Sequence, residues 1–277
     1  MELSLILQVF VVGVAAGGLG ALVGIGGGIL IVPFMTLIVG LPIHVAIGSS
    51  LIAVVATSCS SASVLLRKRL ANVKLGITLG LASAVGAILG GITATRLNQQ
   101  TLSIIFAITM VLLAYSILNK VSGDNLGEKV CDPGRMGSIF FDEHLHKQVC
   151  YRVEKIPLGL SLSFIGGNIS GLLGIGGGAI NVPVMVLGMG VPLKAAVATS
   201  NYMIGITAIS SAFIFYTRGF VNPLIAAPTA IGIFIGATLS SRLLGKFKSK
   251  NLARLLAAIL VFLSIQMVLS SFGIKFR

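Results

Sequence analysis

The stretch LVGIGGGILIVPF at residues 22–34 decides the fold, because it returns 150 positions later as LLGIGGGAINVPV at residues 172–184. Each copy leads from an apolar run through a glycine block, GIGGG, to a Val-Pro pair. Three consecutive glycines make a poor helix interior. The sequence therefore predicts that a helix ends at each block and that another begins near residue 28 and near residue 178.

The surrounding chain has the composition of a membrane protein. Of its 277 residues, 56% are hydrophobic and only 10% are charged, whereas about a quarter of a soluble chain is charged. Apolar stretches of roughly 17–25 residues with few or no charges are typical of membrane-spanning helices. Such stretches lie at 4–22, 44–66, 73–95, 101–118, 156–173, 195–216, 222–240 and 252–272, with shorter ones at 28–40 and 178–190. We expect an all-α polytopic membrane protein with the lipid bilayer as its surroundings.

The two copies stay similar beyond the glycine block. Aligned at an offset of 150, 14 of the 29 positions 22–50 match an identical residue. Farther on, GGITATRL (90–97) is similar to GATLSSRL (236–243). Internal repeats in an apolar chain are typical of transporters. We predict a first transmembrane repeat over 1–118, a connecting loop over 119–155 and a second transmembrane repeat over 156–277.

The basic residues indicate that the two repeats have opposite orientations. The loop at 67–74 has four Lys/Arg and the next loop, 96–100, has one. In the second repeat the loop at 217–222 has one and the loop at 241–254 has five. Because cytoplasmic loops carry the excess of Lys and Arg, we expect 67–74, 119–155 and 241–254 inside and both chain ends outside. These loops account for much of the net charge of +13, and we expect no nucleic-acid partner.

Segments 4–22 and 28–40 have two alternative arrangements. They either cross the membrane twice or form a re-entrant hairpin with the glycine block at its tip, because a 13-residue helix at ~1.5 Å per residue falls short of the ~30 Å hydrocarbon core. Inversion of the repeats is compatible with both.

The connecting loop contains four potential metal ligands. Cys131, His144, His146 and Cys150 lack the spacing of a standard zinc site, so we expect no metal and no cofactor. Alternating polar and apolar residues around 138–142 and 148–153 predict a small cytoplasmic β-hairpin instead.

The glycine blocks have three interpretations. A dinucleotide site needs G-x-G-x-x-G, but Ile29 stands where the third glycine belongs, and no Lys-Ser/Thr follows for a phosphate loop. Small-xxx-small spacing, as in Gly86 and Gly90, lets membrane helices pack closely. In repeat transporters broken helices meet near the midplane and hold the substrate. Since a helix N-terminus attracts anions, two inverted copies would direct two N-termini at one central anion.

Polar residues in the predicted helices fit the third interpretation. GSS at 48–50 and ATSN at 198–201 are equivalent, and their hydroxyl and amide groups can donate to oxyanion oxygens at little burial cost. A single serine in a membrane helix commonly bonds back to its own helix. All seven acidic residues lie outside the candidate spans, which argues against a cation substrate. The predicted substrate-binding residues are Gly26, Gly27, Gly28, Ser49, Ser50, Gly176, Gly177, Gly178, Thr199, Ser200 and Asn201.

The two long motifs resemble the signature repeats of the sulfite exporter TauE/SafE family, also known as the toluenesulfonate uptake permease family. They are GIGGGILIVPFMTLIVGLPIHVAIGSSL (24–51) and GLLGIGGGAINVPVMVLGMGVPLKAAVATSN (171–201), and the resemblance covers nearly the whole chain. It implies an integral inner-membrane transporter of small sulfur oxyanions, such as sulfite, or of organosulfonates. It fixes neither substrate nor direction. GSS stands where many members have Gly-Thr-Ser, which keeps the hydroxyl.

The sequence thus predicts a secondary transporter that moves a small sulfur-containing anion by alternating access of two inverted halves. The alternatives are a passive anion channel and, less favoured, a membrane sulfur-relay protein that uses Cys59. No acid–base pair or catalytic triad is visible in the apolar segments, so we expect no enzyme. A coupling ion, proton or sodium, and the oligomeric state are left open.

Overall fold

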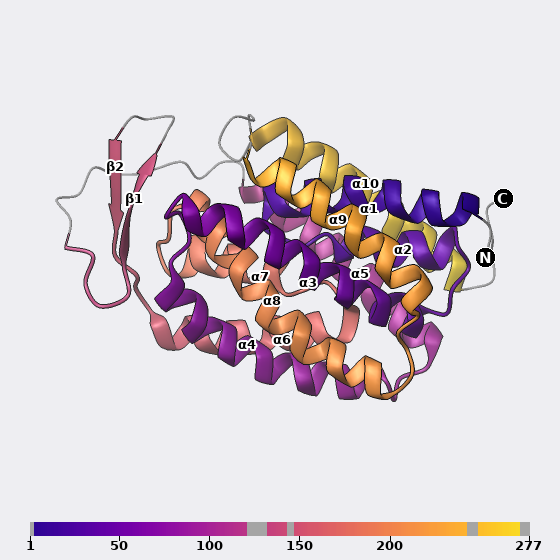
Figure 1. The fold of residues 1–277 in the computed structure, drawn as a ribbon. Helices are drawn as coiled ribbons and strands as arrows, with labels where there is room; N and C mark the ends of the chain where they lie inside the picture. The colour runs from indigo at the N-terminus through magenta and orange to yellow at the C-terminus, as the bar shows by residue number, and fades with distance from the viewer. Residues whose placement is uncertain (1–2, 121–131, 143–146, 243–248, 272–277) are drawn as a thin grey trace.

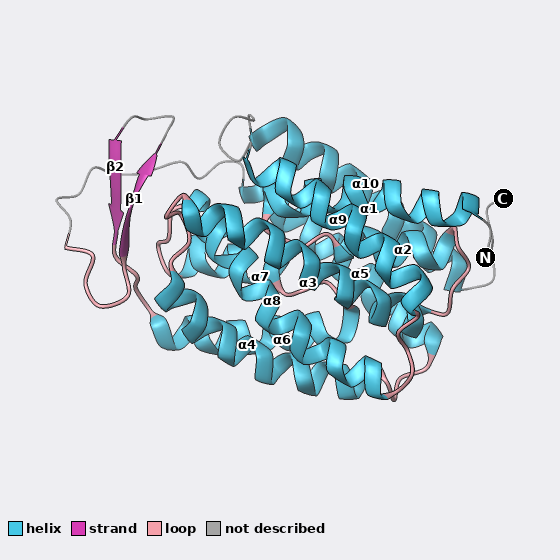
Figure 2. Cartoon of the chain, viewed as in Figure 1, coloured by secondary structure: helices cyan, strands magenta, loops and turns pink. Residues whose placement is uncertain are grey.

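The computed structural model describes residues 3–120, 132–142, 147–242 and 249–271, and it is dominated by helices (Figures 1 and 2). In chain order the elements are α1 (Leu3–Val23), α2 (Gly28–Leu37), α3 (Ile43–Arg67), α4 (Val73–Ala94), α5 (Gln99–Lys120), β1 (Ser138–Asp142), β2 (Lys147–Tyr151), α6 (Ile156–Leu173), α7 (Gly178–Pro183), the π-helix η1 (Val184–Gly188), α8 (Leu193–Thr217), α9 (Pro223–Arg242) and α10 (Ser249–Ser271). Within the described ranges, six helices are long and apolar enough to cross a membrane: α1, α3, α4, α6, α8 and α9. The predicted all-α polytopic membrane protein is confirmed.

Both glycine blocks interrupt helices at the predicted places. The backbone φ angles are 93° at Gly26 and 75° at Gly27, and they are 91° and 81° at the equivalent Gly176 and Gly177. Residues with a Cβ rarely adopt this left-handed conformation. Glycine is therefore required at these positions, and the restart of a helix at residues 28 and 178 is confirmed.

The β-hairpin expected in the connecting loop is present. β1 pairs antiparallel with β2, and Phe140 lies opposite Val149. Phe140 is buried while its neighbours Ile139 and Phe141 are exposed, which is the alternation that the sequence contains. Cys131, His144 and His146 lie outside the described residues, and the described part of the chain has no group of three His, Cys, Asp or Glu side chains that could hold a metal ion.

One end of the helical bundle carries the β-hairpin and is called the insert end here (Figure 1). The loop after α3 contacts the insert through Asn72, whose Nδ2 donates to the carbonyl oxygen of Met136 at 2.7 Å. The same loop reaches the end of α9, where Lys68 Nζ donates to the carbonyl oxygen of Arg242 at 3.5 Å. Basic loops from both repeats and the insert therefore share one end of the molecule.

The loop after α8 lies at the opposite end, called the far end here. The amide of Asn222 donates to Ser49 Oγ at 3.2 Å, near the start of α3. The ring of Phe220 stacks on His44, with 5.1 Å between the ring centroids. The loops after α3 and α8 occupy equivalent places in the two repeats, and these contacts put them at opposite ends.

Each short helix folds back beside the longer helix before it. α1 runs in the same direction as α9, since Gly232 packs on Phe10 while Ser240 Oγ donates to the carbonyl oxygen of Gly18 at 2.7 Å. α1 thus starts at the far end, and α2 returns to that end after the glycine block (Figure 1). α2 has ten residues, about 15 Å long at ~1.5 Å per residue, half of the ~30 Å core. Helices α1 and α2 therefore form a hairpin with the first glycine block at its tip.

The second hairpin enters from the insert end. The amide of Glu154, just before α6, donates to the carbonyl oxygen of Met189, just after η1, at 3.1 Å. α7 contains only six residues and continues as η1, next to Pro183. A proline lacks the amide hydrogen that a regular helix needs, and the wider π-turn follows it.

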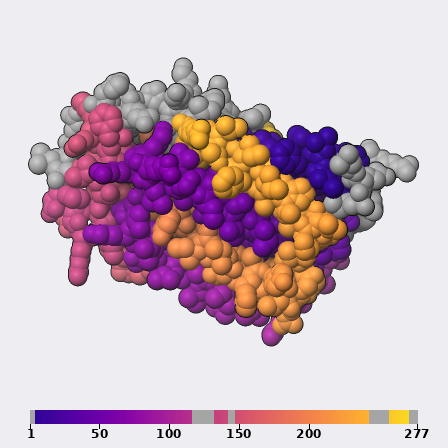
Figure 3. Space-filling model, viewed as in Figure 1, coloured from indigo at the N-terminus to yellow at the C-terminus, as the bar shows by residue number. Residues whose placement is uncertain are grey.

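The long helices pack across the two repeats. α1 lies on α9 and α4 lies on α6, and Figures 1 and 3 show α9, in orange, between α1 and α3. A Cβ added at Gly167 in α6 would overlap the backbone of Ser83, and a Cβ at Gly17 would lie 2.5 Å from the carbonyl oxygen of Ile233. These two contacts are equivalent at the offset of 150. The predicted close packing at small residues therefore holds for α1–α9 and α4–α6.

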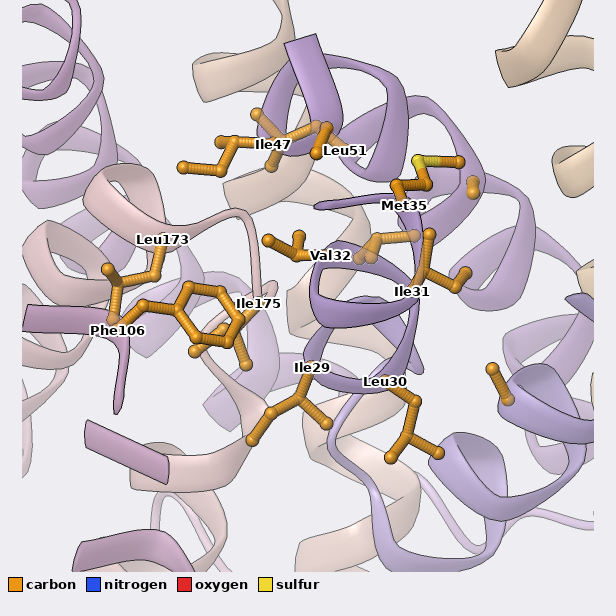
Figure 4. Packing of buried hydrophobic residues seen from close by; sticks show 14 of the residues in the cluster. Ile29, Leu30, Ile31, Val32, Met35, Ile47, Leu51, Phe106, Leu173 and Ile175 are labelled. Carbon is orange, nitrogen blue, oxygen red and sulfur yellow. The ribbon is translucent and has the colours of Figure 1, made fainter. Parts of the chain in front are cut away.

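The middle of the bundle is apolar around α2. Figure 4 shows side chains of α2 facing Ile47 and Leu51 of α3 on one side and Phe106 and Ile175 on the other. These four side chains are at most 2% exposed. The glycine blocks are thus enclosed by packed apolar groups.

Which end faces the cytoplasm can be measured by cysteine labelling. In a background with Cys59, Cys131 and Cys150 all replaced by serine, we expect Lys74→Cys at the insert end to be protected from an impermeant thiol reagent in intact cells. Arg218→Cys at the far end should react. Both side chains are exposed, so access to the reagent depends on the side of the membrane. Reaction of Lys74→Cys from outside would reverse the orientation given by the positive loops, and the unlabelled background chain is the control.

Candidate substrate site at the glycine blocks

The two glycine blocks touch each other inside the bundle. A Cβ added at Gly28 would overlap the carbonyl oxygen of Gly174, and a Cβ at Gly178 would overlap the carbonyl oxygen of Gly24. All four glycines are buried. Residues 150 positions apart therefore form one continuous buried structure, and even a methyl group cannot be placed at either contact.

Ser50 and Ser200 hold the blocks of opposite repeats. Ser50 Oγ shares its proton between the carbonyl oxygen of Ile47 in its own helix, at 2.8 Å, and that of Gly174, at 3.2 Å, while Ser200 Oγ donates to the carbonyl oxygen of Gly24 at 2.9 Å. The two bonds are equivalent at the offset of 150. Both hydroxyls are fully buried and have used their only proton, so they contribute acceptor lone pairs in this conformation.

Ser49 and Thr199 form a second equivalent pair, one residue earlier. Thr199 Oγ1 accepts from the amide of Asn72 at 3.0 Å, as Ser49 Oγ accepts from Asn222 at 3.2 Å. The predicted hydroxyl clusters therefore lie next to the glycine blocks and also hold the loops of the opposite repeat.

Asn72 connects this region to the β-hairpin. Its Nδ2 donates to Tyr151 Oη at 3.2 Å, and its Oδ1 caps α4 by accepting from the amide of Leu75 at 3.1 Å. Burial raises the pKa of Tyr151, and the hydrogen bond with Asn72 opposes that rise. The insert is thus joined to the loop that contacts Thr199.

Asn201 is only partly satisfied. Its Nδ2 donates to the carbonyl oxygen of Ala21 at 2.9 Å. Its Oδ1 is buried without a hydrogen-bond partner. Nearby, Thr57 Oγ1 donates to the carbonyl oxygen of Gly26 at 3.0 Å, so the first glycine block is held by side chains of both repeats.

Free amide groups remain where the helices restart. Among the described residues, the amides of Gly28 and Ile29 have no acceptor, and neither have those of Gly178 and Ala179. The first amides of any helix lack internal partners, and such groups attract anions. Each block therefore leaves two amide groups without an acceptor among the described residues, and their joint use as an anion site stays a prediction.

Three polar side chains near the second block were not predicted. Ser163 Oγ, Ser170 Oγ and both polar atoms of Asn181 are buried without a hydrogen-bond partner. The repeat alignment contains the signal that could have found one of them, because Asn181 stands where the first copy has the apolar Ile31.

A sequence model of the family described as "Sulfite exporter TauE/SafE" matches residues 9–267. The chain belongs to this family. The family consists of membrane transporters, and the resemblance drawn from the two glycine motifs is confirmed.

Full-length relatives support the same assignment. The probable membrane transporter protein YunE of Bacillus subtilis (strain 168) is 29% identical over 266 residues, which cover 93% of this chain and 95% of YunE. The probable membrane transporter protein MJ0441 of Methanocaldococcus jannaschii is 28% identical and covers 96% of this chain and 97% of its own. A TauE/SafE family protein 6 of Arabidopsis thaliana is 28% identical over 117 residues, 41% of this chain and 27% of that protein. No solved structure matches the chain.

Proposed function

We propose that this TauE/SafE protein is a secondary transporter that moves a small sulfur-containing anion, sulfite or another sulfur oxyanion or organosulfonate. The observation that carries the proposal is the meeting of the two glycine blocks, with their free amides, in a buried apolar region. Residues 3–120 and 156–277 contain no Asp or Glu, so an anion there meets no carboxylate.

The proposed binding residues are the glycines and hydroxyls predicted from the sequence. Gly26–Gly28 and Gly176–Gly178 supply close backbone approach and amide donors. Ser49, Ser50, Thr199, Ser200 and Asn201 surround them and exchange partners as the halves move. In this structure the hydrogen bonds of these side chains join opposite repeats. We expect such bonds to change partners when the two repeats move relative to each other during transport.

Equivalent contacts at the two ends support alternating access. The amide of Asn72 bonds Thr199 toward the insert end, and the amide of Asn222 bonds Ser49 toward the far end. We infer that opening toward one side separates one of these contacts while the other stays formed. Two inverted halves, 1–118 and 156–277, then exchange roles around a fixed central site.

Flux measurements test this function. Purified protein in liposomes should move radiolabelled sulfite, thiosulfate or sulfoacetate in a saturable way, while empty liposomes move none. Failure with all three compounds would contradict the substrate class. Unitary currents without countertransport would instead indicate a passive anion channel.

A further inference from the structure

The second glycine block faces a group of buried polar atoms that have no partner in the protein. Asn181 in α7 is 0% exposed and Ser170 in α6 is 1% exposed. A Cβ built at Gly177 would lie 3.5 Å from Asn181 Nδ2 and 3.6 Å from Ser170 Oγ. Ser163 is also buried and unpaired, but it lies two turns before Ser170 in α6, about 10 Å away along the helix, and is not part of this group.

Buried polar atoms are almost always hydrogen-bonded in native proteins. Three unpaired atoms on two neighbouring residues, Ser170 and Asn181, are therefore available to an external partner. Both the amide oxygen and the amide nitrogen of Asn181 are unpaired. Flipping the side-chain amide, which exchanges these two atoms, would therefore leave both positions unpaired as well.

A small cavity lies beside these groups. Its volume is about 10 Å³, and its lining includes Ser170, Gly177 and Ala179 together with Thr109 of α5. Room of this size holds about one water molecule. A ligand larger than water can enter only if this cavity widens.

The first repeat has no counterpart of this group. The residues equivalent to Ser170 and Asn181 are Gly20 and Ile31. A Cβ added at Gly20 would overlap the backbone of Gly27, so the equivalent place is filled by the chain itself. The repeats are alike in backbone and differ in side-chain chemistry.

We propose that Ser170 and Asn181 form an oxyanion-binding subsite that belongs to the second repeat alone and takes a singly charged oxyanion with one hydroxyl, such as hydrogen sulfite. The inference rests on the proposed function and names its ligand-recognising side chains. The Ser170 hydroxyl and the Asn181 amide nitrogen donate to the ligand oxygens, and the Asn181 amide oxygen accepts from the ligand hydroxyl.

The charge of the ligand follows from its surroundings. The groups that line the cavity or lie unpaired beside it are neutral. Burying two negative charges without a paired cation costs more than burying one. A monoprotonated oxyanion therefore fits better than a dianion, and it also supplies the donor that the amide oxygen lacks.

Repeat-swap variants test the subsite. Asn181→Ile and Ser170→Gly introduce the residues that the first repeat has at the same positions. Asn181→Asp keeps the size of the side chain and removes the donor. Sulfite binding to purified protein is measured by calorimetry in mildly acidic buffer, where hydrogen sulfite predominates, and flux is measured in liposomes. We expect binding to weaken at least tenfold in each variant, with unchanged helix content and elution volume.

Ser241→Ala is the matched control, because Ser241 Oγ is also buried and unpaired but lies at the end of α9. It should bind sulfite as the parent does. Equal binding by Asn181→Ile and the parent would overturn the subsite while leaving sulfite transport by the parent intact. No binding and no flux in the parent would overturn the proposed function as well.

Methanesulfinate tests the hydroxyl requirement. It is a singly charged anion in which a methyl group replaces the hydroxyl of hydrogen sulfite, so it leaves the Asn181 amide oxygen unpaired. We expect it to bind the parent at least tenfold more weakly than hydrogen sulfite. Equal affinity for the two anions would overturn the ligand class.

Discussion

Transport of sulfite should fall to the level of empty liposomes when leucine replaces Gly27 or Gly177, while membrane insertion stays normal. At Gly27 a Cβ would lie 2.8 Å from the carbonyl oxygen of Ala16, and at Gly177 it would lie 3.4 Å from Ser170 Cβ. A longer side chain at Gly177 fills the cavity beside Ser170. Both positions are left-handed, which costs a residue with a Cβ about 1–2 kcal/mol. Leucine raises the hydropathy of the segment, so insertion is preserved.

Gly40→Leu and Gly219→Leu separate backbone strain from blockage of the site. Their φ angles are 75° and 73°, and nothing lies within 4 Å of a Cβ at either position. We expect these variants to keep most of their flux. Flux is measured with radiolabelled sulfite at equal amounts of reconstituted protein. Normal flux in both Gly27→Leu and Gly177→Leu would show that the glycine blocks serve helix packing and do not bind the substrate.

Leucine at Gly167 should prevent recovery of folded protein. A Cβ there overlaps the oxygen, carbonyl carbon and Cα of Ser83, all of them backbone atoms, so no side chain can move aside. Overpacking of this kind costs about 1–3 kcal/mol when the surroundings relax, and a contact between two backbones relaxes least. We expect aggregated material on size-exclusion chromatography after detergent extraction.

Two alanine substitutions test the same contact between α4 and α6 with a smaller side chain. Gly167→Ala should lower the melting temperature, whereas Gly91→Ala should leave it unchanged or raise it. A Cβ at Gly91 meets Ile214 at 3.5 Å, an ordinary van der Waals distance, and alanine favours a helix by roughly 1 kcal/mol over glycine. Equal melting temperatures for the two variants would show that α4 and α6 do not need a bare backbone at their crossing.

The prediction from sequence worked best where the cause is local. Hydropathy over about 20 residues identifies a span without reference to its neighbours. The helix break at each GIGGG block follows from three adjacent glycines, and the β-hairpin follows from alternation within a few residues. The assignment of Ser49, Ser50, Thr199, Ser200 and Asn201 to a substrate site stays a prediction, although these residues do lie beside the blocks.

The unpaired Asn181 was missed for a physical reason. Whether a buried amide is satisfied depends on which atoms of other segments come within about 3 Å of it. Asn201 in α8 finds the carbonyl oxygen of Ala21, and Asn181 in α7 finds nothing. Neither outcome can be read from the residues around them in the chain.

By itself, the sequence determined that this is a helical membrane protein of two similar parts, each broken at a GIGGG block, because hydropathy and backbone freedom are properties of neighbouring residues. The distribution of Lys and Arg also predicted that the loops after α3 and α8 lie at opposite ends. Only the tertiary structure decided that the two blocks touch and that Ser50 and Ser200 each bond the block of the other repeat. Those facts depend on the packing of segments 150 positions apart, where close contact between glycine backbones fixes which groups meet.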